Sequence, residues 1–113
     1  MHELSISENI LYIVENEAHK HNLKRIKEIK IKTGEISDII PENLEYCFEI
    51  ISKGTVAEGA KIIVEKLPIK ILCLDCGKEF TIKKKNLQCP ECNSKNLKII
   101  GGNEFFIESM EAE

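Results

Sequence analysis

The apolar positions of this chain change period along its length, which predicts an alternation of helices and strands. Residues 6–18 repeat at helical spacing, and Ser5 with Glu8 three residues later forms a capping-box pattern. The apolar members of this stretch are Ile6, Ile10, Leu11, Ile13, Val14 and Ala18. We therefore expect a helix that begins within the first few residues and ends near Asn22.

A second helix is predicted from residue 41 onward. Pro41 suits the first helical turn, and residues 44, 47, 48 and 51 form an i, i+3, i+4, i+7 apolar stripe. Gly54 stands where a C-terminal cap belongs. Cys47 falls on the stripe with no histidine near it in sequence, so we interpret it as a small core residue and not as a nucleophile.

Alternating or β-branched stretches predict the strands. Ile29 and Ile31 alternate with lysines up to Gly34, and residues 61–67 form a second strand that Pro68 halts. Shorter strands are expected at 80–82 and 97–100 and a last one from Phe105 toward Met110. Ile26 is out of phase with Ile29 and Ile31, which suggests a bulge or the edge of the strand.

The last strand has no neighbour of its own, so it should return to the first sheet. This predicts an α+β fold, in which a two-helix domain with a three-stranded mixed sheet covers residues 1–69 plus 100–113. A zinc-ribbon-like domain with four cysteines is inserted at residues 70–99.

Four cysteines within that insertion are the strongest chemical signal in the chain. Cys73, Cys76, Cys89 and Cys92 spell two C-x-x-C pairs separated by twelve residues. Four thiolates at this spacing can surround one Zn²⁺ tetrahedrally, so we expect a structural zinc site. Gly77 and Asn93 follow the two pairs, and both residue types tolerate the left-handed backbone that such tight turns need.

Composition and charge narrow the class of protein. The 113 residues are 42% hydrophobic with a net charge of −3, and no apolar run is long enough for a transmembrane helix. We expect no membrane contact and, because no signal peptide is visible, a cytoplasmic location in which the cysteines bind metal and do not form disulfides. Residues 70–98 carry +4, which four thiolates and Zn²⁺ reduce to about +2. This patch is too weak to indicate nucleic acid, and Lys83-Lys84-Lys85 is interpreted as a solvated hairpin tip.

A second candidate site lies at the amino terminus. The chain begins Met1-His2-Glu3, and Met1 should be retained because His2 is bulky. The α-amine, the His2 amide and His2 Nδ1 can chelate one ion, with either the amide nitrogen or the carboxylate of Glu3 beside them. Such a nitrogen-rich square plane suits Ni(II) or Cu(II).

These features occur together in a known family. The Met-His-Glu start, Lys32-x-Gly34-Glu35, the segment Val56-Ala57-Glu58-Gly59-Ala60, the late cysteine pairs and the acidic tail follow one another in order. Over essentially its whole length the chain resembles the HypA/HybF family of nickel metallochaperones.

The resemblance implies a protein that is not an enzyme. Members load Ni(II) into the large-subunit precursor of [NiFe]-hydrogenase together with the GTPase HypB, and some serve urease maturation. By this resemblance His2 is the essential nickel ligand, with Met1 and Glu3 beside it, and the four cysteines hold structural Zn(II). The oligomeric state is left open, a homodimer included.

Two other functions remain as alternatives at this stage. A zinc-ribbon adaptor for nucleic acid or a transcription partner would use the same four cysteines, although the acidic tail and scarce aromatic residues oppose it. A thiol redox enzyme built on C-x-x-C fits two ribbon-spaced pairs poorly. His19 and His21, two residues apart, cannot share a helical face and are interpreted as solvated partners of a helix C-terminus.

Overall fold

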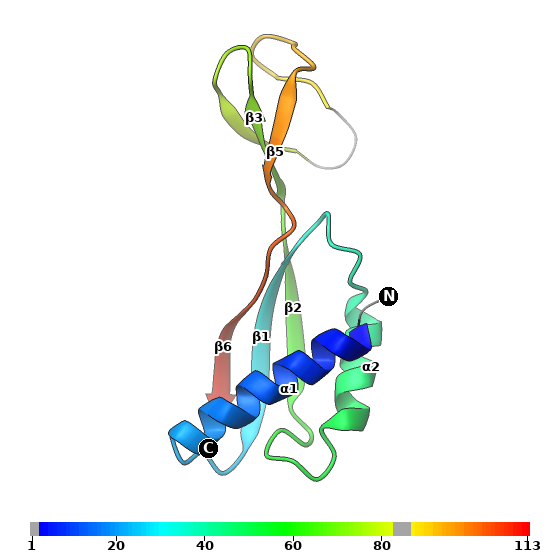
Figure 1. Ribbon diagram of the computed structural model, residues 1–113, viewed down its shortest axis with the longest axis vertical. Coiled ribbons are helices and arrows are strands. Elements are labelled where there is room, and N and C mark those ends of the chain that lie inside the picture. Colours follow the sequence, from blue (N-terminus) through cyan, green and yellow to red (C-terminus); the bar gives the residue numbers. More distant parts are fainter. Residues whose placement is uncertain (1–2, 83–86) are drawn as a thin grey trace. The chain divides into compact units, whose positions relative to one another are not determined.

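The computed structural model describes residues 3–82 and 87–113. Met1, His2 and the Lys83–Lys85 run lie outside these described residues. Within them the chain forms two helices and six strands (Figure 1). The bounds are α1 Glu3–Lys20, β1 Ile26–Gly34, α2 Pro41–Ile51, β2 Lys61–Leu67, β3 Ile69–Cys73, β4 Glu79–Ile82, β5 Leu97–Gly101 and β6 Phe105–Ala112.

The strands form two three-stranded sheets, with orders β2-β1-β6 and β4-β3-β5. The chain also divides into two compact units. The first unit comprises residues 1–32, 38–65 and 106–113, and the second comprises 33–37 and 66–105. Two helices with two small sheets make the fold α+β, as the sequence predicts. Neither described helix is long and apolar enough to cross a membrane.

The sheet β2-β1-β6 is mixed, as expected. The ends of β1 and β2 meet where Glu35 N–H donates to Leu67 O at 2.9 Å, so these strands run in the same direction, joined through α2. In contrast, β6 runs antiparallel to β1, because Glu113 N–H donates to Arg25 O before the start of β1 and Gly34 N–H donates to Glu104 O at its end. The three directions can be followed in Figure 1.

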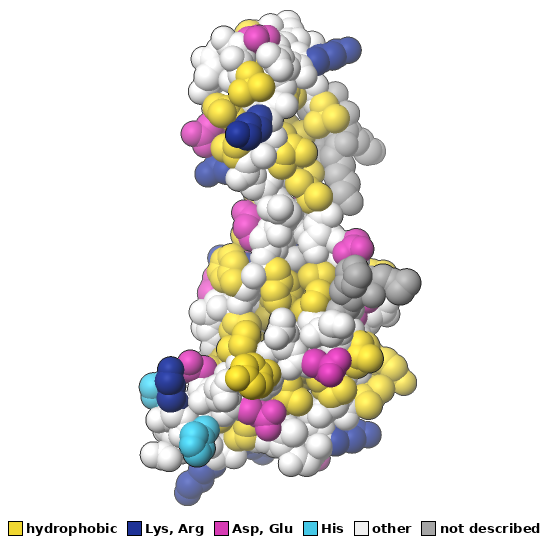
Figure 2. Space-filling model, in the orientation of Figure 1, with side chains coloured by type: hydrophobic (Ala, Val, Ile, Leu, Met, Phe, Trp, Pro, Cys, Tyr) yellow, Lys and Arg dark blue, Asp and Glu magenta, His cyan; other side chains and the backbone are white. Residues whose placement is uncertain are grey.

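Helix α1 supplies one side of the core of the first unit. Its buried positions are Glu3, Ser7, Ile10, Val14 and Ala18, which recur every three or four residues. The predicted apolar face is wrong at Ile13, which is 45% exposed. Successive residues turn by about 100° around a helix, so Ile13 points away from the stripe on which Val14 lies. Hydrophobic side chains therefore also gather on the outer surface over α1 and α2, as Figure 2 shows.

The N-termini of the two helices are built differently. Ser5 lies inside α1, which begins at Glu3, so the capping-box interpretation of Ser5 is wrong. Helix α2 begins at Pro41 as predicted, with Leu44 and Phe48 buried and Cys47 half-buried on its inward stripe. Its N-cap residue is Ile40, whose side chain makes no capping hydrogen bond.

The second unit is organised around β3. This strand pairs antiparallel with β4, where Ile71 lies opposite Phe80, and antiparallel with β5, where Ile71 lies opposite Ile99. The strands at 80–82 and 97–100 were predicted, but the central strand Ile69–Cys73 was not. Pro68 and the first cysteine confine it to five residues, too few for its alternation to stand out.

Within the second unit, the backbone at residues 34–36 lies in close contact with the backbone at Gly102. Ile36 N–H donates to Gly102 O at 2.7 Å, and a Cβ placed on Gly34 would lie 1.9 Å from that same carbonyl oxygen. Gly102 itself has a φ of +120°, a backbone conformation that residues other than glycine rarely adopt. Only glycine fits at Gly34 because backbone atoms occupy the space of a side chain.

Candidate metal centres

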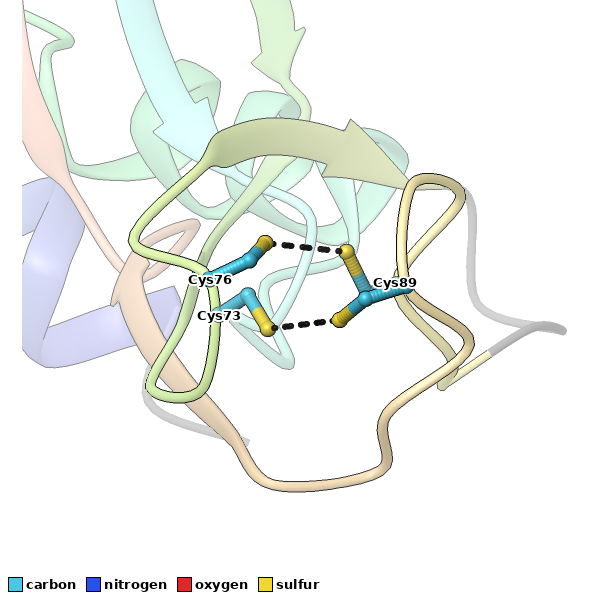
Figure 3. Close-up of side chains that lie close together, drawn as sticks. Cys73, Cys76 and Cys89 are labelled. Carbon is cyan, nitrogen blue, oxygen red and sulfur yellow. Dashed lines mark hydrogen bonds between the residues drawn. The ribbon is translucent and has the colours of Figure 1, made fainter.

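Four cysteine sulfurs converge at one end of the β4-β3-β5 sheet. Cys73 ends β3 and Cys76 follows it in a turn, and Cys89 faces them from a second turn (Figure 3). Cys92 lies in this second turn, which precedes β5. All four Sγ atoms lie within 4.8 Å of one another. The Cys73–Cys92 and Cys76–Cys89 pairs are each 3.6 Å apart. Tetrahedral zinc with bonds of about 2.3 Å places its sulfurs about 3.8 Å apart, so the cluster fits one such ion.

The two cysteine turns share one hydrogen-bond pattern. In the first, Cys73 N–H donates to Lys78 O and Gly77 N–H donates to Cys73 O, both at 2.9 Å. In the second, Cys89 N–H donates to Ser94 O and Asn93 N–H donates to Cys89 O, again at 2.9 Å. The residues after each pair have positive φ, 77° at Gly77 and 60° at Asn93. The predicted left-handed positions are confirmed.

Polar side chains join the two turns across the cluster. Asp75 accepts hydrogen bonds from Ser94 Oγ and, at 3.3 Å, from Asn96 Nδ2. These bonds, that from Ser94 first, lower the pKa of Asp75. Lys78 Nζ and Glu91 Oε1 lie 2.5 Å apart. Both contacts pair a residue of the first turn with a residue of the second, so they hold the two cysteine pairs face to face.

The backbone also favours a thiolate at Cys73. The N–H groups of Cys76 and Asp75 donate toward its sulfur, and the first of these bonds does most to lower the pKa of Cys73 to about 7. A metal ligand must be deprotonated, so this environment prepares the sulfur for a cation. Cys73 and Cys89 are buried, whereas Cys76 and Cys92 are exposed. The donor set of four sulfurs matches the closed structural sites that zinc prefers.

Of the three predicted nickel residues, the described residues include Glu3. It begins α1, is only 6% exposed, and its Oε2 accepts a hydrogen bond from Ile40 N–H at 3.0 Å. That bond is the main cause that lowers the pKa of Glu3 to about 2. No sequence pattern predicts this contact, because 37 residues separate the two partners. The sequence shows only that Ile40, the residue before Pro41, cannot cap α2 with its own side chain.

The remaining histidines lie away from the cysteine cluster in sequence. His19 is in the last turn of α1, and His21 Nε2 lies 3.3 Å from Glu17 Oε2. Across residues 3–82 and 87–113, the four cysteines are the only group of three or more Cys, His, Asp or Glu side chains that converges to metal-binding distances. The surface interpretation of His19 and His21 agrees with their exposure.

Sequence comparison relates the whole chain to one family. The family model for HypA, described as a hydrogenase/urease nickel incorporation metallochaperone, matches residues 1–112. The hydrogenase maturation factor HypA of Aquifex aeolicus is 40% identical over 113 residues, which cover 100% of this chain and 98% of the relative. HypA of Moorella thermoacetica is 36% identical over 113 residues, with 100% of both chains covered.

Solved structures agree with the sequence relatives. The solution structure of the Ni metallochaperone HypA from Helicobacter pylori matches with a TM-score of 0.69 and 26% identity, over 99% of this chain and 97% of that one. Another solution structure of a HypA protein gives a TM-score of 0.76 and 26% identity, over 100% and 97% of the two chains. The shared architecture extends over both units of the chain.

Proposed function

Because the chain belongs to the HypA family of nickel metallochaperones, we propose that it binds Ni(II) at its N-terminus and delivers it to the large-subunit precursor of [NiFe]-hydrogenase. His2 is the essential ligand, with Met1 and Glu3 beside it. The observation that carries this proposal is the match of residues 1–112 to the family, which includes the Met1-His2-Glu3 start of the chain. A site made from the terminus is open to a partner, which suits a carrier that must release its metal.

The cysteine cluster has a different task in this proposal. Zn(II) held by Cys73, Cys76, Cys89 and Cys92 braces a zinc-binding domain at residues 70–99, while residues 1–69 plus 100–113 form the nickel-binding domain. The sulfur separations of 3.6 Å support one tetrahedral ion. Bound zinc here supplies a structural crosslink, because a site closed by four protein ligands leaves no position for substrate.

The proposed protein partners follow from membership of the HypA family. The chain contains no phosphate-binding G-x-x-x-x-G-K-[ST] loop, so we assign nucleotide hydrolysis to a HypB-type GTPase and no catalysis to this protein. Urease maturation proteins are a second set of partners, which the family description supports. We place the protein in the cytoplasm. The relatives from Aquifex aeolicus and Moorella thermoacetica are hydrogenase maturation factors and give no support to a nucleic-acid adaptor.

The proposal is tested by titrating Ni(II) into the zinc-loaded protein. Wild-type chain should bind one equivalent, and His2→Ala should abolish that binding because the imidazole is the only side-chain nitrogen in the chelate. His19→Ala is the matched control, since it removes an exposed imidazole at the far end of α1. Nickel binding of undiminished affinity in His2→Ala would refute the proposal.

A further inference from the structure

Helices α1 and α2 pack against each other, and their outer sides carry the two tyrosines of the chain. Tyr12 on α1 is 67% exposed, Tyr46 on α2 is 66% exposed, and Ile50, one turn after Tyr46, is 49% exposed. All three lie on the side of their helix opposite the buried stripes, which include Val14 and Phe48. Tyrosine is enriched at protein interfaces, where its ring buries apolar surface and its hydroxyl stays in contact with water.

The charge around these side chains has a single sign. Residues 3–18 and 41–51 contain seven glutamates and no lysine, arginine or histidine. Two of the seven are engaged within the chain, since Glu3 is buried and Glu17 lies beside His21. The other five are exposed and form no ion pair within the described part of the chain, namely Glu8, Glu15, Glu42, Glu45 and Glu49.

We call the surface made by Tyr12, Tyr46, Ile50 and these five glutamates the helical face. Figure 2 shows hydrophobic and acidic side chains together over α1 and α2, with lysine and arginine side chains at the edges of the first unit. The cations of this unit are concentrated instead in residues 20–32, which contain six lysines and arginines. The helical face is therefore both apolar and negatively charged.

A depression beside α2 adds shape to this charge. Its volume is about 410 Å³, and it is lined by Glu45 and Glu49, one helical turn apart, and by residues 59–62 around the start of β2. Lys61 is among these residues but forms no ion pair with either glutamate within the described part of the chain. A long cationic side chain suits this place, because its methylene groups can lie against the apolar lining while its charged end reaches a carboxylate.

We propose that the helical face is a docking surface for a basic amphipathic helix of a partner protein. The apolar side of that helix covers Tyr12, Tyr46 and Ile50, and its lysines or arginines pair with the surrounding glutamates. In such complexes the apolar anchors supply affinity, and the charges along the rim guide approach and orientation. The surface includes neither the first three residues nor the four cysteines, so the inference does not depend on the metals proposed above.

The sign of the charge argues against other occupants. A second copy of this chain joined through the same face would bring five exposed glutamates against another five. Nucleic acids carry phosphates, and the cytoplasmic surfaces of membranes are anionic, so the helical face repels both. The occupant that fits is a protein segment that combines apolar and positively charged side chains.

The test measures the binding of a defined helical peptide to the full-length, zinc-loaded protein. The probe is a fluorescein-labelled peptide of about 18 residues, with leucine at helical spacing on one side and lysine or arginine elsewhere. One control peptide has the same composition in an order without an apolar side, and a second has glutamate in place of every cation. Fluorescence anisotropy gives the affinities, and circular dichroism reports the folding of each protein variant.

Variants of the protein locate the binding surface. Tyr46→Ser and the double variant Glu45→Gln with Glu49→Gln alter the helical face, whereas Ile99→Ser and Glu111→Gln alter exposed residues of the same types outside it. Tyr46→Ser should weaken binding of the basic peptide about tenfold, because a central apolar anchor is lost. The double variant should weaken binding about fivefold and reduce its dependence on salt. Ile99→Ser and Glu111→Gln should bind like wild type, and both control peptides should bind at least about tenfold more weakly than the probe.

Several results would overturn the inference. Absence of peptide binding, or equal weakening in Ile99→Ser and Tyr46→Ser, would show that the helical face is not the docking surface. Equal affinity for the acidic and the basic peptide would remove the role of charge. A dimer that Tyr46→Ser dissociates in analytical ultracentrifugation would assign the face to a second copy of the chain. Sedimentation with phosphatidylserine vesicles that the same variant abolishes would assign it to a membrane.

Discussion

At the scale of single residues, the described start of the chain is held by one buried carboxylate. Glu3 is 6% exposed and bonded to Ile40 N–H at 3.0 Å. The sequence pattern identified Glu3 as a candidate nickel residue but left open whether it binds through oxygen or nitrogen. The contact with Ile40 could not be predicted, because no local pattern pairs a glutamate with an uncapped helix 37 residues away.

The contact between Glu3 and Ile40 should make the free energy of unfolding depend on pH. The pKa of Glu3 is lowered from 4.5 to about 2 in the folded chain, mainly by Ile40 N–H. The unfolded chain therefore binds this proton more tightly, so the contribution is complete above a pH of about 4.5 and is lost as the pH falls toward about 2. We expect the difference in unfolding free energy between wild type and Glu3→Gln to shrink over that range.

Urea unfolding of the two proteins at a series of pH values measures this difference. Protonation of the cysteine cluster affects both proteins alike and cancels from the comparison. A difference that stays constant from neutral pH down to a pH of about 2 would contradict the assignment of Glu3 as an ionised cap.

At the scale of elements, periodicity predicted the helices and most strands. The stripe that includes Leu44 and Phe48 defined α2, because tertiary packing buries one face of a helix. Strand β3 was missed, since five residues between Pro68 and the cysteine turn carry too short an alternation. The cysteine turns were predicted in detail because metal geometry and positive φ constrain them locally, at Gly77 and Asn93.

The approach of Gly34 to Gly102 gives a prediction at this scale. Gly34→Ala should destabilise the fold by about 3 kcal/mol, because its Cβ would overlap a backbone carbonyl that cannot rotate away. Gly54→Ala is the control, since Gly54 has a φ of +81° but no heavy atom within 4 Å of a Cβ. The unfolding free energy of Gly54→Ala should fall by only about 1 kcal/mol, the cost of placing alanine in a left-handed backbone conformation. Chemical denaturation measures both, and equal losses would show that the close contact is unimportant.

The cysteine cluster gives a further prediction. If the cluster holds zinc as proposed, Cys92→Ser should lose that ion and weaken the β4-β3-β5 sheet, because three sulfurs no longer close the tetrahedron. Cys47→Ser, which alters the cysteine outside the cluster, should keep a full equivalent of zinc. Metal analysis gives the zinc content, and amide hydrogen exchange over residues 69–101 reports the sheet. A metal-free Cys92→Ser protein with unchanged protection would refute the structural role of zinc.

At the scale of the whole molecule, the chain divides into two compact units, and the proposal assigns a different metal to each of them. The cluster that dominates the sequence has four sulfurs in a closed arrangement suited to a permanent ion. The proposed working site uses the first three residues, of which Glu3 is anchored to α2. Membership of the HypA family supports the proposal that one chain carries both sites, with nickel passed on to a partner and zinc retained.

The most direct test of the central claim blocks the terminal amine and leaves every side chain in place. A protein whose Met1 α-amine is acetylated retains His2, Glu3 and all four cluster cysteines, but its terminal nitrogen can no longer bind a metal ion as a free amine. Isothermal titration of Ni(II) into this zinc-loaded protein should show loss of the one-equivalent binding proposed for the unmodified protein. Binding of one equivalent with wild-type affinity would contradict the proposal that the N-terminus is the nickel site.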